Sequence, residues 1–152
     1  NYDNIGVAIG AFERTLLTPS RFDDFLNGDE DALNQSEKRG LKKFMKMGCA
    51  NCHNGVAIGG NSYKKIGLVK PYETTDMGRY EVTGLESDKK AFKVPSLRNI
   101  AKTAPYFHDG SVETLDEAIQ LMAKHQLGRD QAGHGMVRDI KAFLESLTGK
   151  DQ

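Results

Sequence analysis

The chain is 152 residues long, which suits a single domain with a buried core. Its 21 basic residues balance its 21 acidic ones, so the composition gives no argument for binding nucleic acid or an anionic membrane surface. No apolar stretch approaches the ~20 residues that a membrane-spanning helix needs, and two cysteines are too few for a disulfide framework.

The first part of the chain is predicted to form two helices. Apolar residues recur at helical spacing over residues 4–17, and this helix is expected to stop before Pro19. A second helix is expected to run from about Ser36 to the first cysteine. Asn34 and Glu37 have the spacing of a capping box at its start.

The middle of the chain looks irregular, whereas its end looks helical. Residues 54–92 are rich in Gly, Asn, Thr and Lys without a sustained period, and so long a loop usually wraps around something. A short helix is expected within residues 93–102. Thr114 begins a further helix, and a last helix covers 136–147 before Gly149. The prediction is therefore a mostly α-helical protein.

Both cysteines lie in the motif Cys49-Ala50-Asn51-Cys52-His53, for which three explanations compete. A redox dithiol would need its first cysteine at a helix N-terminus, but here the predicted helix precedes the pair. A structural zinc ion would need a second pair of ligands, and the remaining histidines are scattered. In covalent haem attachment, two thiols form thioethers with one porphyrin and the following imidazole binds the iron. We favour haem attachment.

A covalent haem predicts the fold class, which is a cytochrome c-like domain around one haem c. Gly40 and Phe44 on the first haem helix, with Phe143 on the last, suggest a close helix crossing. We expect a single domain over 1–152, with a helix and an interdomain segment at 1–34 and a haem-binding core at 35–149. Since haem c is attached outside the cytoplasm, we expect a periplasmic protein.

The residue on the other side of the iron is left open by spacing alone. Met77, Met122 and Met136 are the candidates, with His108 as an outsider. A methionine on an amphipathic stripe, such as Met122, is more often core filler than a ligand. A thioether ligand would raise the reduction potential relative to a second imidazole.

Several segments together resemble the C-terminal haem domain of bacterial dihaem cytochrome c peroxidases. They include "FERTLLTPSRFDDFLNGD", "GLKKFMKMGCANCHNG", "GRYEVTG", "FKVPSLRNIAKTAPYFHDGSVETLDEAIQLM" and "FLESLTG", and the likeness extends over residues 5–149. In that family this domain carries the high-potential, electron-transferring haem. The resemblance implies that His53 is the proximal ligand and Met122 the distal one.

Other residues are weaker candidates. The resemblance implies a calcium ion between two domains, bound in part by backbone oxygens of Thr103 and Pro105, although a simple turn also explains these residues. Arg98 and Arg79 are candidates for pairing with haem propionates, because buried carboxylates favour arginine forks. His108 could hydrogen-bond a propionate or lie at the domain junction. The alternative interpretation is that Arg98 and Arg79 are ordinary surface arginines and that His108 is a histidine bonded within a turn.

The chain also departs from that family. It has one C-x-x-C-H motif and no tryptophan, whereas the family has a second motif in an N-terminal, peroxide-binding domain and a tryptophan between its haems. We therefore expect the electron-entry part of such an enzyme, without peroxide-reducing apparatus of its own. A small cytochrome or copper protein would be the donor, and the peroxidatic haem domain the acceptor. The alternatives are a free-standing monohaem carrier, a haem whose methionine detaches to allow peroxidase activity, and a homodimer formed through the junction surface.

Overall fold

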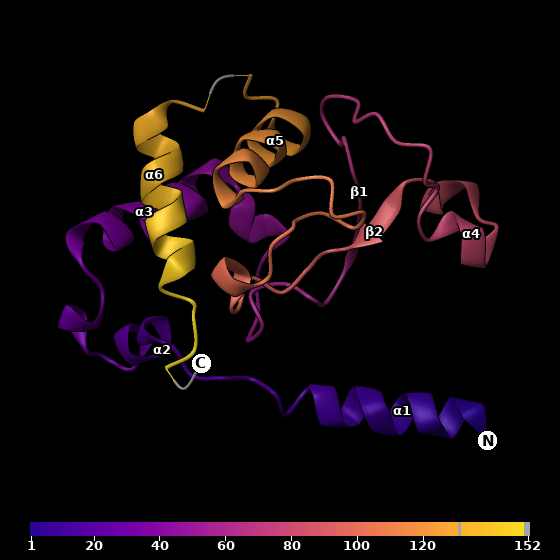
Figure 1. Ribbon diagram of the computed structural model, residues 1–152, viewed down its shortest axis with the longest axis horizontal. Coiled ribbons are helices and arrows are strands. Elements are labelled where there is room, and N and C mark those ends of the chain that lie inside the picture. The colour runs from indigo at the N-terminus through magenta and orange to yellow at the C-terminus, as the bar shows by residue number, and fades with distance from the viewer. Residues whose placement is uncertain (131, 151–152) are drawn as a thin grey trace.

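The computed structural model describes residues 1–130 and 132–150, and its main body is a helical unit with a small sheet at one side (Figure 1). The α-helices are α1 (Tyr2–Glu13), α2 (Arg21–Leu26), α3 (Gln35–Met47), α4 (Tyr80–Thr83), α5 (Leu115–Leu127) and α6 (His134–Glu145). The short 3-10 helices are η1 (Glu30–Ala32), η2 (Cys49–Asn51), η3 (Glu86–Asp88) and η4 (Ile100–Lys102). The prediction of a mostly α-helical, cytochrome c-like fold is confirmed.

The sequence signals at helix ends form the predicted caps. The Asn34 side chain accepts hydrogen bonds from the backbone N–H groups of Ser36 and Glu37, at 2.9 and 3.0 Å. The Glu37 carboxylate accepts the Asn34 N–H in return at 2.8 Å, which completes the capping box of α3. Thr114 accepts the N–H of Glu117 at the start of α5.

The middle of the chain is less irregular than predicted. β1 (Tyr63–Lys65) and β2 (Ala91–Lys93) form a two-stranded antiparallel sheet in which Lys64 pairs with Phe92, and α4 lies between the two strands in sequence. Strands of three residues are too short to leave a readable alternation of apolar and polar side chains.

The short helix predicted within residues 93–102 is wrong over most of its length. Only Ile100–Lys102 is helical, as η4. The backbone before it pairs with the segment that follows the cysteine motif: Val94 N–H donates to the Ser62 carbonyl at 2.9 Å, and Leu97 N–H donates to the Ile58 carbonyl at 3.2 Å. Because these backbone N–H groups already donate hydrogen bonds to a distant segment, they cannot donate to carbonyls within a helical turn.

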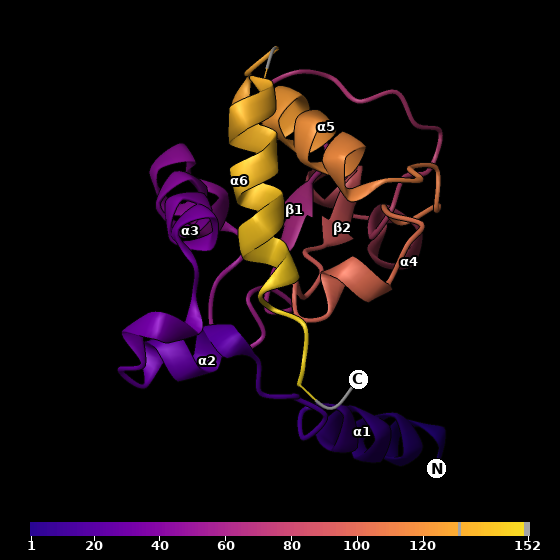
Figure 2. The same cartoon turned by 60° about the vertical axis from the view of Figure 1, so that its left-hand side comes forward.

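The core lies where α6 crosses α3 and contacts α5 (Figure 2). Phe143 of α6 is 1% exposed, and its ring centroid is 5.3 Å from those of Phe44 and Phe22. Gly40 makes the close approach, since a Cβ added there would lie 1.9 Å from the Asp139 carbonyl oxygen. The close crossing predicted from Gly40, Phe44 and Phe143 is confirmed.

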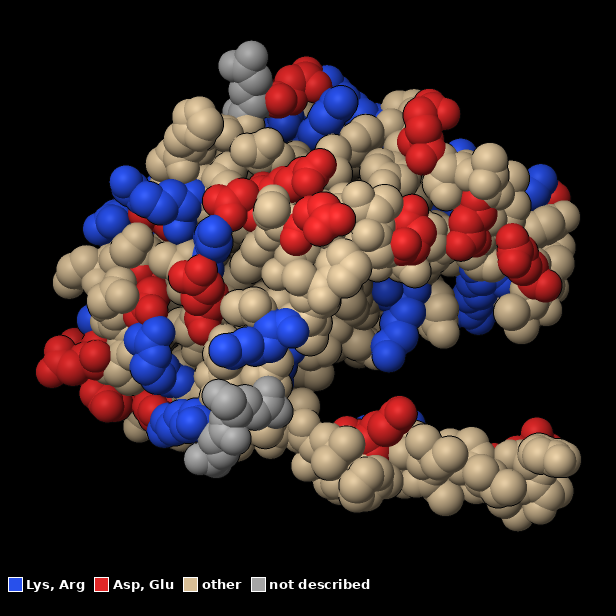
Figure 3. Space-filling view, in the orientation of Figure 1, with Lys and Arg blue, Asp and Glu red and all other residues tan. Residues whose placement is uncertain are grey.

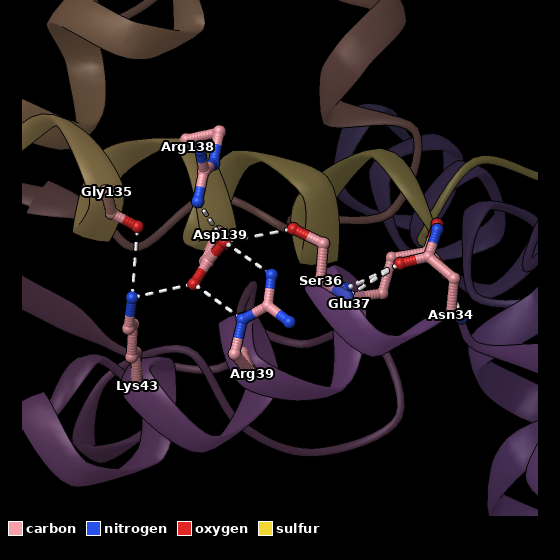
Figure 4. Close-up of polar contacts among 8 residues, drawn as sticks. All are labelled: Asn34, Ser36, Glu37, Arg39, Lys43, Gly135, Arg138 and Asp139. Carbon is pink, nitrogen blue, oxygen red and sulfur yellow. Dashed lines mark hydrogen bonds and ion pairs between the residues drawn. The ribbon is translucent and has the colours of Figure 1, made fainter.

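A polar cluster joins the same two helices (Figure 4). The carboxylate of Asp139 is 2% exposed and accepts hydrogen bonds from Ser36 at 2.9 Å, Arg39 at 3.1 Å and Lys43 at 2.7 Å. Bonds from Arg39 and Lys43 hold the pKa of Asp139 well below its usual range, against the opposing effect of burial. The buried charge is thereby compensated by three donors on α3.

The N-terminal helix stands apart from this body. Figure 3 shows α1 projecting beside the molecule with open space between them. The chain between α1 and α2 is tied to the body at its far end, where Ser20 bridges to Gly149 and the Lys150 N–H donates to the Pro19 carbonyl at 3.1 Å. None of the described helices is long and apolar enough to cross a membrane.

Replacing Asp139 by asparagine is expected to destabilise the protein by about 1–3 kcal/mol at neutral pH, because a charge-assisted cluster loses its anion. Since the pKa of Asp139 is lowered in the folded state, its contribution is present above the unfolded-state pKa of about 3.9 and is lost as the pH falls further. Urea unfolding from pH 7 to pH 3 should therefore show a difference in stability between the two proteins that is constant near neutral pH and begins to narrow below about pH 4. A constant difference at all pH values would contradict the assignment.

Candidate functional site

The cysteine motif begins where α3 ends. Gly48 adopts a left-handed conformation with φ of 96°, which stops α3 and lets the chain turn directly into η2. A 3-10 helix has about three residues per turn, so Cys49 and Cys52 lie on the same side of it. The two cysteines form no disulfide bond. Two sulfur atoms are thus presented side by side from one turn.

The two thiols border a mostly apolar cavity of about 410 Å³. Its wall comes from the end of α3, the turn with the motif, the two strands, the loop around residue 106 and α5. A volume of this size is within the range of cofactor and ligand pockets. It brings together seven of the nine predicted site residues, which are Cys49, Cys52, His53, Thr103, Pro105, His108 and Met122.

The imidazole of His53 has the properties of a metal ligand. Burial lowers its pKa, against the opposing effect of the nearby Pro95 and Ile58 carbonyl oxygens, so the ring is held in its neutral form. Its Nδ1 atom is buried and forms no hydrogen bond within the described part of the chain. Metal-binding histidines commonly use one ring nitrogen as the ligand and donate the other N–H to a carbonyl.

Gly59 forms the support behind this imidazole. A Cβ at this position would lie 2.1 Å from the Pro95 carbonyl oxygen and 3.4 Å from Nδ1 of His53, and the backbone φ is 127°. Glycine is the residue that tolerates both the conformation and the close approach.

Cys49 does not have the lowered pKa of a reactive redox thiol. Burial raises the pKa of Cys49, whereas reactive cysteines have lowered pKa values. Adjacent cysteines that border an apolar cavity beside a neutral imidazole fit covalent attachment of a flat apolar cofactor.

On α5, the cavity wall includes Met122, next to Ile119 and Ala123. Of the three methionines that spacing had left open, Met77 lies in the loop before α4 and Met136 packs against the core from α6. Neither of these two borders the cavity among the described residues, so Met122 alone of the three shares it with His53.

Arg98 and Arg79 make their contacts elsewhere. Arg98 forms a fork with Asp23, with N···O distances of 2.8 and 2.7 Å, and this pair holds the pKa of Asp23 well below its usual range. Arg79 pairs with Asp88 at 3.2 Å and lies 4.5 Å from the centroid of the Tyr63 ring. Neither arginine is among the described residues that border the cavity, and their pairing with propionates stays a prediction.

Two lysines at the cavity were missed by the sequence reasoning. Lys64 of β1 and Lys93 of β2 both contribute to its wall. Their ammonium groups are suited to bind the carboxylates of a cofactor. No signal marked them, because they lie in a segment without periodicity and are brought together by strand pairing.

The loop that contains His108 borders the cavity from another side. His108 stacks on Phe92 with ring centroids 4.0 Å apart, and its Nε2 lies 3.4 Å from Asp76. Within the described residues, no group of three or more His, Cys, Asp or Glu side chains could hold a metal ion. The calcium site at Thr103 and Pro105 was expected to use backbone oxygens, and it stays a prediction.

Comparison with known proteins identifies the family. None of the family models matches the chain. The chain is 52% identical over 150 residues to cytochrome c551 peroxidase of Nitrosomonas europaea, and this match covers 97% of the chain and 45% of the relative. It is 47% identical over 156 residues to cytochrome c551 peroxidase of Pseudomonas aeruginosa, covering 99% of the chain and 45% of the relative. The chain corresponds to a single domain of a dihaem cytochrome c peroxidase.

A solved structure agrees with this assignment. The crystal structure of a MauG-like protein associated with microbial copper homeostasis matches with a TM-score of 0.76 and 29% identity, over 88% of the chain and 49% of that protein. The chain thus spans a little under half of the curated relatives, which corresponds to a single domain. Its two adjacent cysteines, neutral imidazole and apolar cavity fit the haem c that the family implies.

Replacing Gly59 by alanine is expected to cost about 1–3 kcal/mol of stability in the haem-loaded protein, because the added methyl group meets the Pro95 carbonyl behind His53. Gly60→Ala is the matched control, since Gly60 also has a positive φ (79°) but a Cβ there meets nothing within 4 Å. Thermal unfolding followed by circular dichroism measures both. Equal losses would mean that backbone conformation alone, and not the contact behind His53, explains the effect.

Proposed function

We propose that this domain transfers electrons through one haem c, which is attached through Cys49 and Cys52 and whose iron is bound by His53 and Met122. The observation that supports this most directly is that all four side chains border one cavity. Met122 is also the position implied by the resemblance to dihaem peroxidases. These two arguments are independent, because one comes from sequence and the other from the packing of α5.

The bound haem would supply an iron that alternates between the ferric and ferrous states. The chain would contribute His53 and Met122 as the two side chains that hold the iron, and two fixed protein ligands would leave little to rearrange when an electron is gained or lost. Burial keeps His53 neutral and able to act as a ligand. A thioether from Met122 and apolar walls built from residues such as Ile119 and Leu144 favour the reduced state, which raises the reduction potential.

We propose that the carboxylates of the haem pair with Lys64 and Lys93, the cationic side chains at the cavity wall. In this arrangement Arg98 has another task. Its fork to Asp23 ties α2 to the body, and its Nε donates to the Val56 carbonyl at 2.7 Å.

The partners and location follow from the family and remain proposals. A small cytochrome or copper protein would deliver the electron, and a peroxidatic haem domain, such as the remaining length of the relatives provides, would receive it. Haem c attachment takes place outside the cytoplasm, so the proposed compartment is the periplasm. A calcium ion at Thr103 and Pro105 would belong to the junction between the two domains.

Met122→His is expected to abolish the far-red absorption band of methionine-bound ferric haem. It should also lower the reduction potential by on the order of 0.2 V, since axial ligands adjust haem potentials over about 0.8 V. Optical spectra and a redox titration of the purified protein measure both effects. Met136→Leu is the control, because Met136 packs against the core from outside the cavity and its loss should leave the band in place. A band that survives in Met122→His would refute the assignment.

The isolated 152-residue chain is expected to show no turnover of hydrogen peroxide, because both axial positions are occupied and the iron has no open site. Its ferrous form should likewise fail to bind carbon monoxide, whereas Met122→Ala should bind it. Stopped-flow absorption with peroxide and optical titration with carbon monoxide give the two readouts. Substantial peroxide turnover by the parent chain would instead support a detachable methionine.

A further inference from the structure

Met122 lies between two parts of α5 that are held by different neighbours. At the start of the helix, the Asp116 carboxylate pairs with Lys141 of α6. The α5 residues of the buried core all lie in its first half: Leu115, Ala118 and Ile119. Beyond Leu121, no residue of α5, all of which are described, belongs to this core. The last turns of the helix therefore need another support.

That support is a segment from the middle of the chain, residues 65–70, which leaves the end of β1 and is called the strap below. The His125 carbonyl accepts hydrogen bonds from the backbone N–H groups of Val69 and Lys70, at 3.0 and 3.1 Å. The Nδ1 atom of His125 lies 3.1 Å from the Lys70 carbonyl oxygen. Because the last carbonyls of a helix have no partner within it, the strap supplies donors that this end of α5 lacks.

Gln126 joins the helix to two further points of the strap. Its side-chain oxygen accepts the Leu68 N–H at 2.8 Å, and its side-chain nitrogen donates to the Lys65 carbonyl at 3.0 Å. Both polar atoms of one side chain thus bind the same segment. Gln126 follows Met122 by four residues, so the two side chains project from the same face of α5, and both border the cavity.

The strap is continuous with the structure behind His53. β1, where the strap begins, pairs with β2 in the antiparallel sheet. Two residues after β2 comes Pro95, whose carbonyl oxygen lies near the His53 imidazole. Hydrogen bonds and a short length of chain therefore connect the support of His53, through the sheet and the strap, to Gln126 and the helix of Met122.

We propose that the strap, acting through Gln126, positions the end of α5 so that Met122 stays bound to the haem iron. This rests on the proposed ligation by His53 and Met122. Gln126 is then a positioning residue, since it acts on the iron through another side chain. An added ligand such as imidazole competes with Met122 for the iron, so its apparent affinity increases with the fraction of protein in which the thioether is released.

Gln126→Leu removes both side-chain hydrogen bonds and keeps a similar volume. In the haem-loaded chain it is expected to raise the affinity of the ferric iron for added imidazole by about 10-fold, because the released state is populated more often. Titration with imidazole, followed through the far-red band of methionine-bound haem, measures this. Hydrogen–deuterium exchange should also become faster at the amides of residues 123–127 and stay unchanged in α6.

Two control variants separate positioning from general stability. Gln120→Leu makes the same replacement on the same helix at an exposed position, and it should leave the imidazole affinity unchanged. Asp139→Asn lowers the stability of the domain at the crossing of α3 and α6, away from the strap, and should leave this affinity unchanged as well.

The outcomes distinguish the role of the strap from the proposed ligation. Equal imidazole affinity in Gln126→Leu and the parent chain would overturn the role of the strap, and so would an equal increase in the two controls. If the parent shows the far-red band and Met122→His removes it, the proposed ligation stands in either case. A parent chain without the band would refute ligation by Met122 and the positioning role together.

Discussion

The close contact of α3 with α6 at Gly40 is the constraint on which the rest of the domain depends. No side chain separates the helices there, so Phe143 can pack on Phe44 and the buried Asp139 can reach its donors on α3. This fixes the direction of α3, and Gly48 then turns the chain into the cysteine motif. The position of the C-x-x-C-H turn thus depends on how α3 crosses α6.

Neighbouring residues of the site must meet two different requirements. An apolar cavity is suited to a porphyrin, yet it must also contain an imidazole whose Nδ1 is shielded from water. The segment around Gly59 and Pro95 meets both demands, because backbone pairing brings the Pro95 carbonyl close to the ring and leaves room only for glycine. Charged side chains lie at the rim, where Lys64 and Lys93 can remain in contact with solvent.

The sequence by itself determined the features that are encoded in neighbouring residues: the C-x-x-C-H motif, the capping box at Asn34 and Glu37, and the long helices. Tertiary structure decided that, of Met77, Met122 and Met136, it is Met122 that shares the cavity with His53, that Arg98 pairs with Asp23, and that the backbone of Val94 and Leu97 bonds to a distant segment instead of forming a helix. The physical reason is the separation in sequence between the residues that interact. A cap or a C-x-x-C-H turn is formed within a few residues, whereas these other features depend on partners tens of residues away, whose position is set by the packing of the whole fold.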